Sequence, residues 1–269
     1  MSTVHTFHLR HDAKPTLLCL HSSGSSGRQW QALAGPLGAR YRVEAPDLLG
    51  YADARPWPSG KPASLDDEAQ ALAPLLNVAP VHLFGHSFGA AVALQIALRW
   101  PERVRSLTLY EPVRFALLFG NAATRAAGES IVAVGRRIGL EALSGALPSA
   151  AARFVDYWSG EGSWQRLTAE RQQAIAARMT KVQAEFEALF ADRTPAVAYR
   201  RLTMPVRLLG GSRSPLPARQ VLDVLAAHLP DATRATQSGV GHMGPVEAPQ
   251  RVLEASGLLP VTQALAQAA

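Results

Sequence analysis

Residues 81–101 have the sequence VHLFGHSFGAAVALQIALRWP, in which an apolar strand pattern meets a helix pattern without a spacer. The motif Gly85-x-Ser87-x-Gly89 lies at the junction. So sharp a turn pushes the side chain of Ser87 outwards, and the small Gly85 and Gly89 let the two elements close on each other. Pro101 ends the helix. The N-terminus of this helix therefore faces Ser87, where free backbone N–H groups favour a developing negative charge.

This segment resembles the nucleophile elbow of the α/β-hydrolase family, and similar landmarks recur in order over nearly the whole chain. A Gly-x-Ser-x-Gly motif alone also fits a surface turn, but the strand before it and the helix after it favour a nucleophile. The resemblance implies an α/β fold with a mostly parallel central sheet flanked by helices. It implies a core formed by residues 1–112 and 202–269, and a helical cap inserted at residues 113–201.

The proposed cap has helix-period sequence in place of short apolar runs. Its clearest stretch is Thr168 to Asp192, in which one apolar face is formed by Ile175, Met179, Val182, Phe186 and Leu189. Core packing explains this stripe without a ligand. In the family such a cap covers the pocket and sets the shape of the substrate.

A small, polar loop, His21 to Gly27, follows the apolar run Thr16 to Leu20. A flexible linker would have the same composition, whereas the buried strand before it favours a site. The loop resembles the family's His-Gly-x loop, in which the x residue supplies one backbone N–H of the oxyanion hole. By that match Ser23 is one donor, and Ser22 stands where glycine is usual. The resemblance implies Phe88, next to the nucleophile, as the second donor.

The histidine of the site is expected at His242, in the loop SGVGHMGPVEAP at residues 238–249. This loop follows the last predicted strand and closely resembles the family's terminal catalytic-histidine loop. The remaining histidines considered are expected to be surface or structural residues: His5, His8, His11, His82, His86 and His228.

The acid that orients the histidine is expected at Glu111, at the end of the strand that precedes the cap. Most α/β-hydrolases take the acid from the loop after the later strand, but residues 206–215 contain no carboxylate, and Ser214 stands in its place. Some branches of the family use the position that Glu111 matches. A glutamate facing water at a strand end is the ordinary alternative. Asp223 and Asp231 are the fallback acids.

Aromatic and apolar residues of the cap are candidates to line the pocket, although packing explains each of them individually: Phe115, Leu118, Phe119, Phe154, Trp158 and Trp164. Their number favours an apolar acyl or alcohol group in the substrate. The residues expected to contact the substrate are Ser22, Phe115, Trp158 and Met243.

The composition fits one large α/β domain with an inserted lobe, because the chain has 269 residues, of which 48% are hydrophobic and 18% charged. Cys19 is the single cysteine, so no disulfide can form within the chain, and it lies in an apolar run. Neither a leader-like apolar segment nor a membrane-spanning run is present in the sequence. We expect a soluble, cytoplasmic protein.

The formal charge of +6 and the pI near 10.0 raise the possibility of a nucleic-acid partner. The basic residues are mostly arginines spread along the chain, without a dense run or an aromatic-interleaved patch. We therefore expect no nucleic-acid partner and no membrane partner. The sequence leaves the oligomeric state open.

These features together predict a serine hydrolase that cleaves a small, largely apolar carboxylic ester through an acyl-enzyme. Serine at the nucleophile position argues against the dehalogenase and epoxide hydrolase chemistry of the same fold. Carbon–carbon bond hydrolysis, lactonase and thioesterase activities remain alternatives, as does a binding protein without turnover. No metal or organic cofactor is expected, because the sequence has no ligand-spaced His/Cys/acid cluster and no dinucleotide fingerprint.

Overall fold

The computed structural model describes residues 4–7, 14–52, 54–57 and 62–259. Its centre is a sheet with the strand order β1-β3-β2-β4-β5-β6-β7, in which β1 runs antiparallel to β3 and the other neighbours pair in parallel. The strands are β1 (Val4–Phe7), β2 (Thr16–Leu20), β3 (Arg42–Pro46), β4 (Val81–His86), β5 (Val104–Tyr110), β6 (Val206–Gly211) and β7 (Ala232–Gln237). The predicted α/β fold with a mostly parallel sheet is confirmed.

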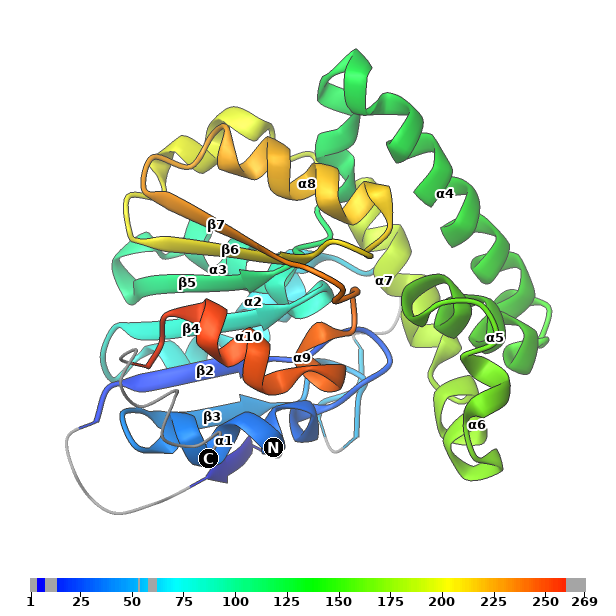
Figure 1. Ribbon diagram of the computed structural model, residues 1–269, viewed down its shortest axis with the longest axis horizontal. Helices are drawn as coiled ribbons and strands as arrows, with labels where there is room; N and C mark the ends of the chain where they lie inside the picture. Colours follow the sequence, from blue (N-terminus) through cyan, green and yellow to red (C-terminus); the bar gives the residue numbers. More distant parts are fainter. Residues whose placement is uncertain (1–3, 8–13, 53, 58–61, 260–269) are drawn as a thin grey trace.

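Helices cover both faces of this sheet, as Figure 1 shows for α1 and α10 on the near side and α2 and α3 behind. The helices around the sheet are η1 (Gly27–Trp30), α1 (Gln31–Gly38), α2 (Leu65–Leu72), η2 (Ala73–Leu76), α3 (Phe88–Arg99), η3 (Pro101–Arg103), α8 (Leu216–Ala226), α9 (Gly244–Glu247) and α10 (Pro249–Ser256). Strand β2 illustrates why two layers form. Leu18 and Leu20 belong to one buried cluster, whereas Leu17 and Cys19 belong to the other, because successive side chains point to opposite faces.

A helical insertion leaves the core after β5 and returns before β6. Its elements are η4 (Phe115–Gly120), α4 (Ala122–Leu143), α5 (Leu147–Ser159), η5 (Trp164–Arg166), α6 (Ala169–Ala176), α7 (Met179–Ala191) and η6 (Ala196–Arg201). Helices α4 to α7 lie together beside the sheet, at the edge where the parallel strands end (Figure 1). They therefore stand over the edge at which open α/β sheets bind ligands.

The stretch from Thr168 to Asp192 is divided between two helices, although its periodicity predicts one continuous apolar face. Helix α6 ends at Ala176 and α7 begins at Met179. Between them Arg178 donates a hydrogen bond to the carbonyl oxygen of Gly24, at 2.7 Å. The periodicity misses this break because Ile175 and Met179 keep the helical spacing across it.

Both junctions of the insertion are tied to each other by a buried arginine. Arg114, just after β5, pairs with Asp192, just after α7, with 3.1 Å between Nε and Oδ2. The guanidinium also donates to Tyr199 at 2.7 Å and to Gln95 at 3.0 Å. A buried charge with this many partners is stable only in one arrangement of the chain, so the network fixes where the insertion leaves and re-enters the core.

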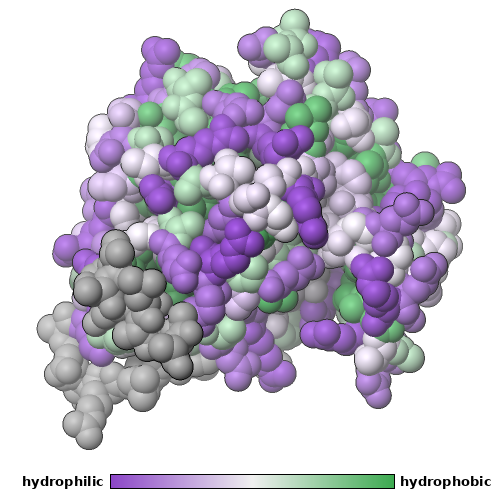
Figure 2. Space-filling model, in the orientation of Figure 1, coloured by the Kyte–Doolittle hydropathy of each residue, from purple (hydrophilic) through white to green (hydrophobic). Residues whose placement is uncertain are grey.

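The visible surface is mixed in character. On the face drawn in Figure 2, hydrophobic residues form small areas separated by hydrophilic ones, outside the grey atoms. Within the described part of the chain, no helix combines the length and apolar character needed to cross a membrane.

Candidate active site

Ser87 lies at the predicted turn between β4 and α3, in a conformation that side chains rarely adopt. Its backbone has φ 55° and ψ −118°. The turn is held by its own amide, which donates to Tyr110 O at 2.9 Å, and by its carbonyl, which accepts from Ala91 N at 3.0 Å. A Cβ at Gly85 or at Gly89 would collide with backbone, so the motif needs both glycines. Strain of this kind costs about 1–3 kcal/mol and is typical of functional sites.

The structure brings Ser87, His242 and Glu111 into one hydrogen-bonded chain. The distance from Ser87 Oγ to His242 Nε2 is 2.9 Å, and that from His242 Nδ1 to Glu111 Oε2 is 2.6 Å. The three residues are 5%, 2% and 0% exposed, respectively. Because a carboxylate only accepts hydrogen bonds, the ring donates from Nδ1, which leaves Nε2 free to accept the serine proton.

Glu111 is fixed at both ends. Its amide donates to Leu209 O at 2.9 Å, and its second carboxylate oxygen, Oε1, accepts from the amide of Gly211 at 2.7 Å. Its φ is 46°, a second strained position in the site. A Cβ at Gly210 would lie 3.1 Å from Glu111 Oε1, so the end of β6 is shaped around this carboxylate.

The other acids considered from the sequence lie elsewhere. Asp223, on α8, pairs with Arg234 and its side chain is 55% exposed. Asp231 is exposed and immediately precedes β7, which places it at the opposite edge of the sheet from Ser87. Ser214 is buried, and its hydroxyl has no hydrogen-bond partner among the described residues. Glu111 is therefore the acid in contact with the imidazole.

Neighbouring rings and hydroxyls hold the His242 loop in place. His86 Nε2 donates to the carbonyl oxygen of His242 at 2.9 Å, and burial lowers the pKa of His86 well below its usual value, which keeps this ring neutral. Tyr110 donates from its hydroxyl to Gly241 O at 2.7 Å. Trp158 of α5 stacks on the His242 ring with 3.9 Å between centroids. The first of these contacts gives His86 a structural role, as expected. His8 and His11 lie outside the described residues.

The His21–Gly27 loop is pinned by side chains on either side. Burial lowers the pKa of His21 to about 4, so its ring is neutral. His21 Nε2 accepts from Leu48 N at 3.0 Å, and Nδ1 therefore carries the proton and donates to Ser22 O at 2.8 Å. Ser22 in turn donates from its hydroxyl to Gln29 Oε1 at 2.8 Å. The serine that replaces the usual glycine thus has its hydroxyl occupied by Gln29.

The two residues expected to supply the oxyanion donors, Phe88 and Ser23, lie near the nucleophile. Phe88 is the first residue of α3, so its N–H lies in the turn that has no intrahelical acceptors. Ser23 lines the same pocket as Ser87.

A pocket adjoins Ser87 and His242, and all four residues expected to contact substrate line it: Ser22, Phe115, Trp158 and Met243. Phe154 lines it as well. Leu118, Phe119 and Trp164, also candidates from the sequence, are not among its lining residues.

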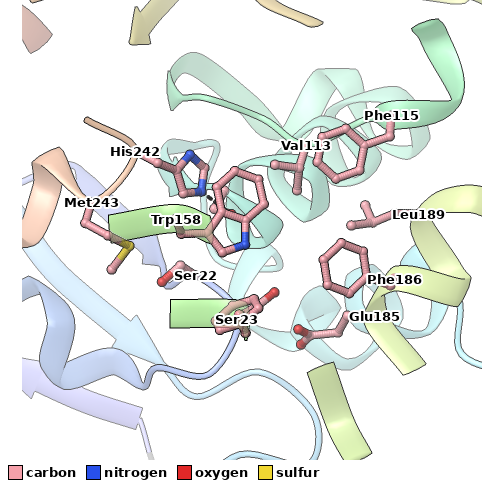
Figure 3. Close-up of a pocket in the computed structure, with 12 residues that line it drawn as sticks. Ser22, Ser23, Val113, Phe115, Trp158, Glu185, Phe186, Leu189, His242 and Met243 are labelled. Atoms are coloured by element: carbon pink, nitrogen blue, oxygen red, sulfur yellow. Dashed lines mark hydrogen bonds between the residues drawn. The ribbon is translucent and has the colours of Figure 1, made fainter. Parts of the chain in front are cut away.

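Sequence reasoning missed four residues of the lining, which are Val113, Glu185, Phe186 and Leu189 (Figure 3). Phe186 and Leu189 were part of a stripe explained by core packing, but helix α7 turns that face towards the pocket. The sequence offers one weak signal, a carboxylate at the edge of this stripe, Glu185.

Within the described residues, no group of three or more His, Cys, Asp or Glu side chains is arranged to hold a metal ion.

Comparison with known proteins places these features in a family. The alpha/beta hydrolase fold model matches residues 15–249. Lipase LipV of Mycobacterium tuberculosis is 39% identical over 99 residues, which are 36% of this chain and 36% of the lipase. Pimeloyl-[acyl-carrier protein] methyl ester esterase of Aeromonas salmonicida is 40% identical over 93 residues, 35% of this chain and 36% of the esterase. The matched stretches thus span about a third of these relatives.

Among solved structures, MenH from S. aureus has a TM-score of 0.76 at 18% identity, over 96% of this chain and 98% of that one. At that identity the likeness concerns the fold. Because the family model covers most of the sequence, the chain belongs to the alpha/beta hydrolase fold family.

Proposed function

We propose that this protein is a serine hydrolase that cleaves a small, largely apolar carboxylic ester through an acyl-enzyme. The observation that carries the proposal is the buried chain from Glu111 through His242 to Ser87, with contacts of 2.6 Å and 2.9 Å. A serine hydroxyl is a weak nucleophile unless a base takes its proton, and a base is effective only if it is held in the correct tautomer. Glu111 holds His242 in this tautomer by accepting a hydrogen bond from Nδ1.

In the first half of the reaction, Ser87 Oγ attacks the ester carbonyl carbon while His242 Nε2 takes the hydroxyl proton. The carbonyl oxygen becomes an oxyanion, which accepts hydrogen bonds from the amides of Ser23 and Phe88. Each such donor contributes about 3 kcal/mol to the transition state. The imidazolium then gives its proton to the leaving alcohol, and the acyl group remains on Ser87.

In the second half, His242 takes a proton from water, which attacks the acyl carbon, and Ser87 leaves with that proton. Burial supports both halves, because the imidazolium–carboxylate pair forms in a site that is 2% exposed at His242 and 0% exposed at Glu111. Hydrogen bonds to charged groups are stronger where water is excluded.

The choice of an ester is supported by the apolar wall of the pocket and by the matched lipase and methyl ester esterase. The apolar wall consists of Val113, Phe115, Phe186 and Leu189. Thioesters, lactones and carbon–carbon bonds next to a carbonyl can be cleaved by the same three side chains, so a substrate panel must include them.

The test is turnover of nitrophenyl butanoate by the wild-type protein and by Ser87→Ala. We expect hydrolysis by the wild type and its loss in the variant, with both proteins unfolding at similar temperatures. Equal turnover by the two proteins would refute the role of Ser87. A panel of an ester, a thioester, a lactone and a dienoate then ranks the bond types.

A further inference from the structure

Glu185 is an ionisable residue of the pocket that the proposed reaction does not use. It lies on helix α7 of the insertion, lines the same pocket as Ser87 and is 1% exposed. Its Oε1 lies 3.1 Å from the Nζ atom of Lys181, four residues earlier on the same helix. Burying a carboxylate is unfavourable unless its charge is paired and its oxygens accept hydrogen bonds, so the position calls for a physical explanation.

Lys181 is paired with Glu185, but it is shared with a second acid, Glu68. Lys181 Nζ lies 2.8 Å from Glu68 Oε1 and 3.1 Å from Glu185 Oε1. Glu68 holds the lysine by a hydrogen bond and also accepts from Leu49 N at 3.0 Å. The single ammonium thus lies between two carboxyl groups, and burial raises the pKa of Glu68 from 4.5 to about 7.

Tyr51 also interacts with Glu185. Burial, then the charge of Glu185 and a hydrogen bond to it, raise the pKa of the Tyr51 hydroxyl well above its usual value. The tyrosine is therefore neutral. Its hydroxyl oxygen accepts from the amide of Gly24 at 2.9 Å, and its proton is available to Glu185.

The pocket consequently has two unlike sides. In Figure 3, Val113, Phe115 and Leu189 lie together on one side, and Glu185 lies on the side of Ser23. The hydroxyl of Ser22, another polar group of the lining, is already engaged by Gln29. A ligand that fills this pocket therefore meets an apolar wall and a buried acceptor.

We infer that Glu185 is a specificity residue, which accepts a hydrogen bond from a hydroxyl or ammonium group of the substrate. This inference rests on the proposed function, since it concerns the substrate of the same pocket. A carboxylate has about four lone-pair sites, so a donor on the substrate can bond to Glu185 beside Lys181 and Tyr51, and a charged donor makes the stronger bond. A substrate with a carboxylate at this place meets a like charge and is disfavoured.

The test compares methyl esters of one chain length, with acid release followed at constant pH. The esters are methyl butanoate, methyl 2-hydroxybutanoate, methyl 3-hydroxybutanoate, methyl 3-aminobutanoate in its ammonium form, and monomethyl succinate. We expect the best donor-bearing ester to exceed methyl butanoate in kcat/KM by about tenfold or more, as for hydrogen bonds to charged groups. Monomethyl succinate should be the poorest substrate.

Two variants of α7 distinguish the effect of the pocket carboxylate, Glu185, from the effect of removing any negative charge from the helix. Glu185→Gln should lower the preference for the ammonium ester by about tenfold and raise the relative rate of monomethyl succinate. Glu187→Gln removes a charge from the exposed side of the same helix, and it should keep the wild-type ratios. Ratios within one variant are independent of the amount of folded enzyme.

Binding provides a readout that needs no hydrolysis. The dissociation constants of the same esters are measured by NMR titration with Ser87→Ala and with Ser87→Ala/Glu185→Gln. Identical preferences in the two proteins would overturn the inference, as would a wild-type enzyme that favours no donor-bearing ester. If no ester is hydrolysed but Glu185→Gln removes a binding preference, the proposed function fails and the role of Glu185 stands.

Discussion

The Glu111→Gln substitution should inactivate the enzyme by placing the imidazole proton on the wrong nitrogen. In the wild type, Glu111 Oε1 accepts from Gly211 N at 2.7 Å and Oε2 accepts from His242 Nδ1 at 2.6 Å. A glutamine keeps the first bond only if its NH₂ group faces Nδ1, which must then be unprotonated. The ring proton moves to Nε2, which can no longer accept the proton of Ser87.

The opposite orientation of the glutamine amide is also unfavourable. It keeps the bond to Nδ1 but sets the NH₂ group against the Gly211 amide, which leaves two buried donors facing each other at a cost of about 1–3 kcal/mol. We therefore expect kcat for nitrophenyl butanoate to fall by about 10³ to 10⁴, equal to about 4–5.5 kcal/mol of activation free energy. Nitrophenolate release measures kcat, and circular dichroism checks that the variant is folded.

Ser214→Ala is the matched control, because Ser214 stands where most of the family carries the acid. Its kcat should stay near the wild-type value. A folded Glu111→Gln enzyme that keeps kcat within about tenfold of the wild type would refute the tautomer argument. A greater loss in Ser214→Ala than in Glu111→Gln would move the acid to another residue.

Three further predictions concern stability and the cap. The free energy of unfolding of Ser87→Gly should exceed that of Ser87→Ala by about 1 kcal/mol or more, because only glycine relieves the strain at φ 55°. Denaturant titrations of the two variants measure this difference. Burial raises the pKa of Glu68 from 4.5 to about 7, so the folded state holds this proton more tightly than the unfolded state does. Urea titrations should therefore show the free energy of unfolding of Glu68→Gln rising relative to the wild type by about 3 kcal/mol between pH 4.5 and 7, and then levelling. A difference that stays constant with pH would contradict the raised pKa of Glu68. Trp158→Ala removes the ring stacked on His242. It should lower kcat/KM for butanoate esters by up to about tenfold and admit bulkier acyl groups. Unchanged acyl selectivity would show that Trp158 does not limit the pocket.

The core of the fold and the elbow could be predicted from sequence because their signals are local. A strand, a Gly-x-Ser-x-Gly turn and a helix adjoin one another in residues 81–101, and no distant contact is needed to recognise them. The position of Glu111 followed from a gap in the pattern, since residues 206–215 hold no carboxylate. The order of these landmarks along the chain predicts the cap and the loop of His242.

The pocket wall could not be predicted in the same way, because it depends on how helix α7 docks on the core. The stripe containing Phe186 and Leu189 has the spacing of a packed helix whether its neighbour is protein or a cavity. The ion pair between Lys181 and Glu68 joins residues 113 positions apart, and no local pattern reveals it. Glu185 therefore becomes a pocket residue only through tertiary structure.

Covalent labelling tests whether the contact between His242 and Ser87 activates this serine. The protein is treated with a fluorophosphonate, and the intact mass and the modified peptide are determined by mass spectrometry. We expect a single adduct on Ser87, which is absent from Ser87→Ala and forms far more slowly in Glu111→Gln. A wild-type protein that stays unlabelled, or that carries the adduct on another residue, would contradict it and favour a binding protein without turnover.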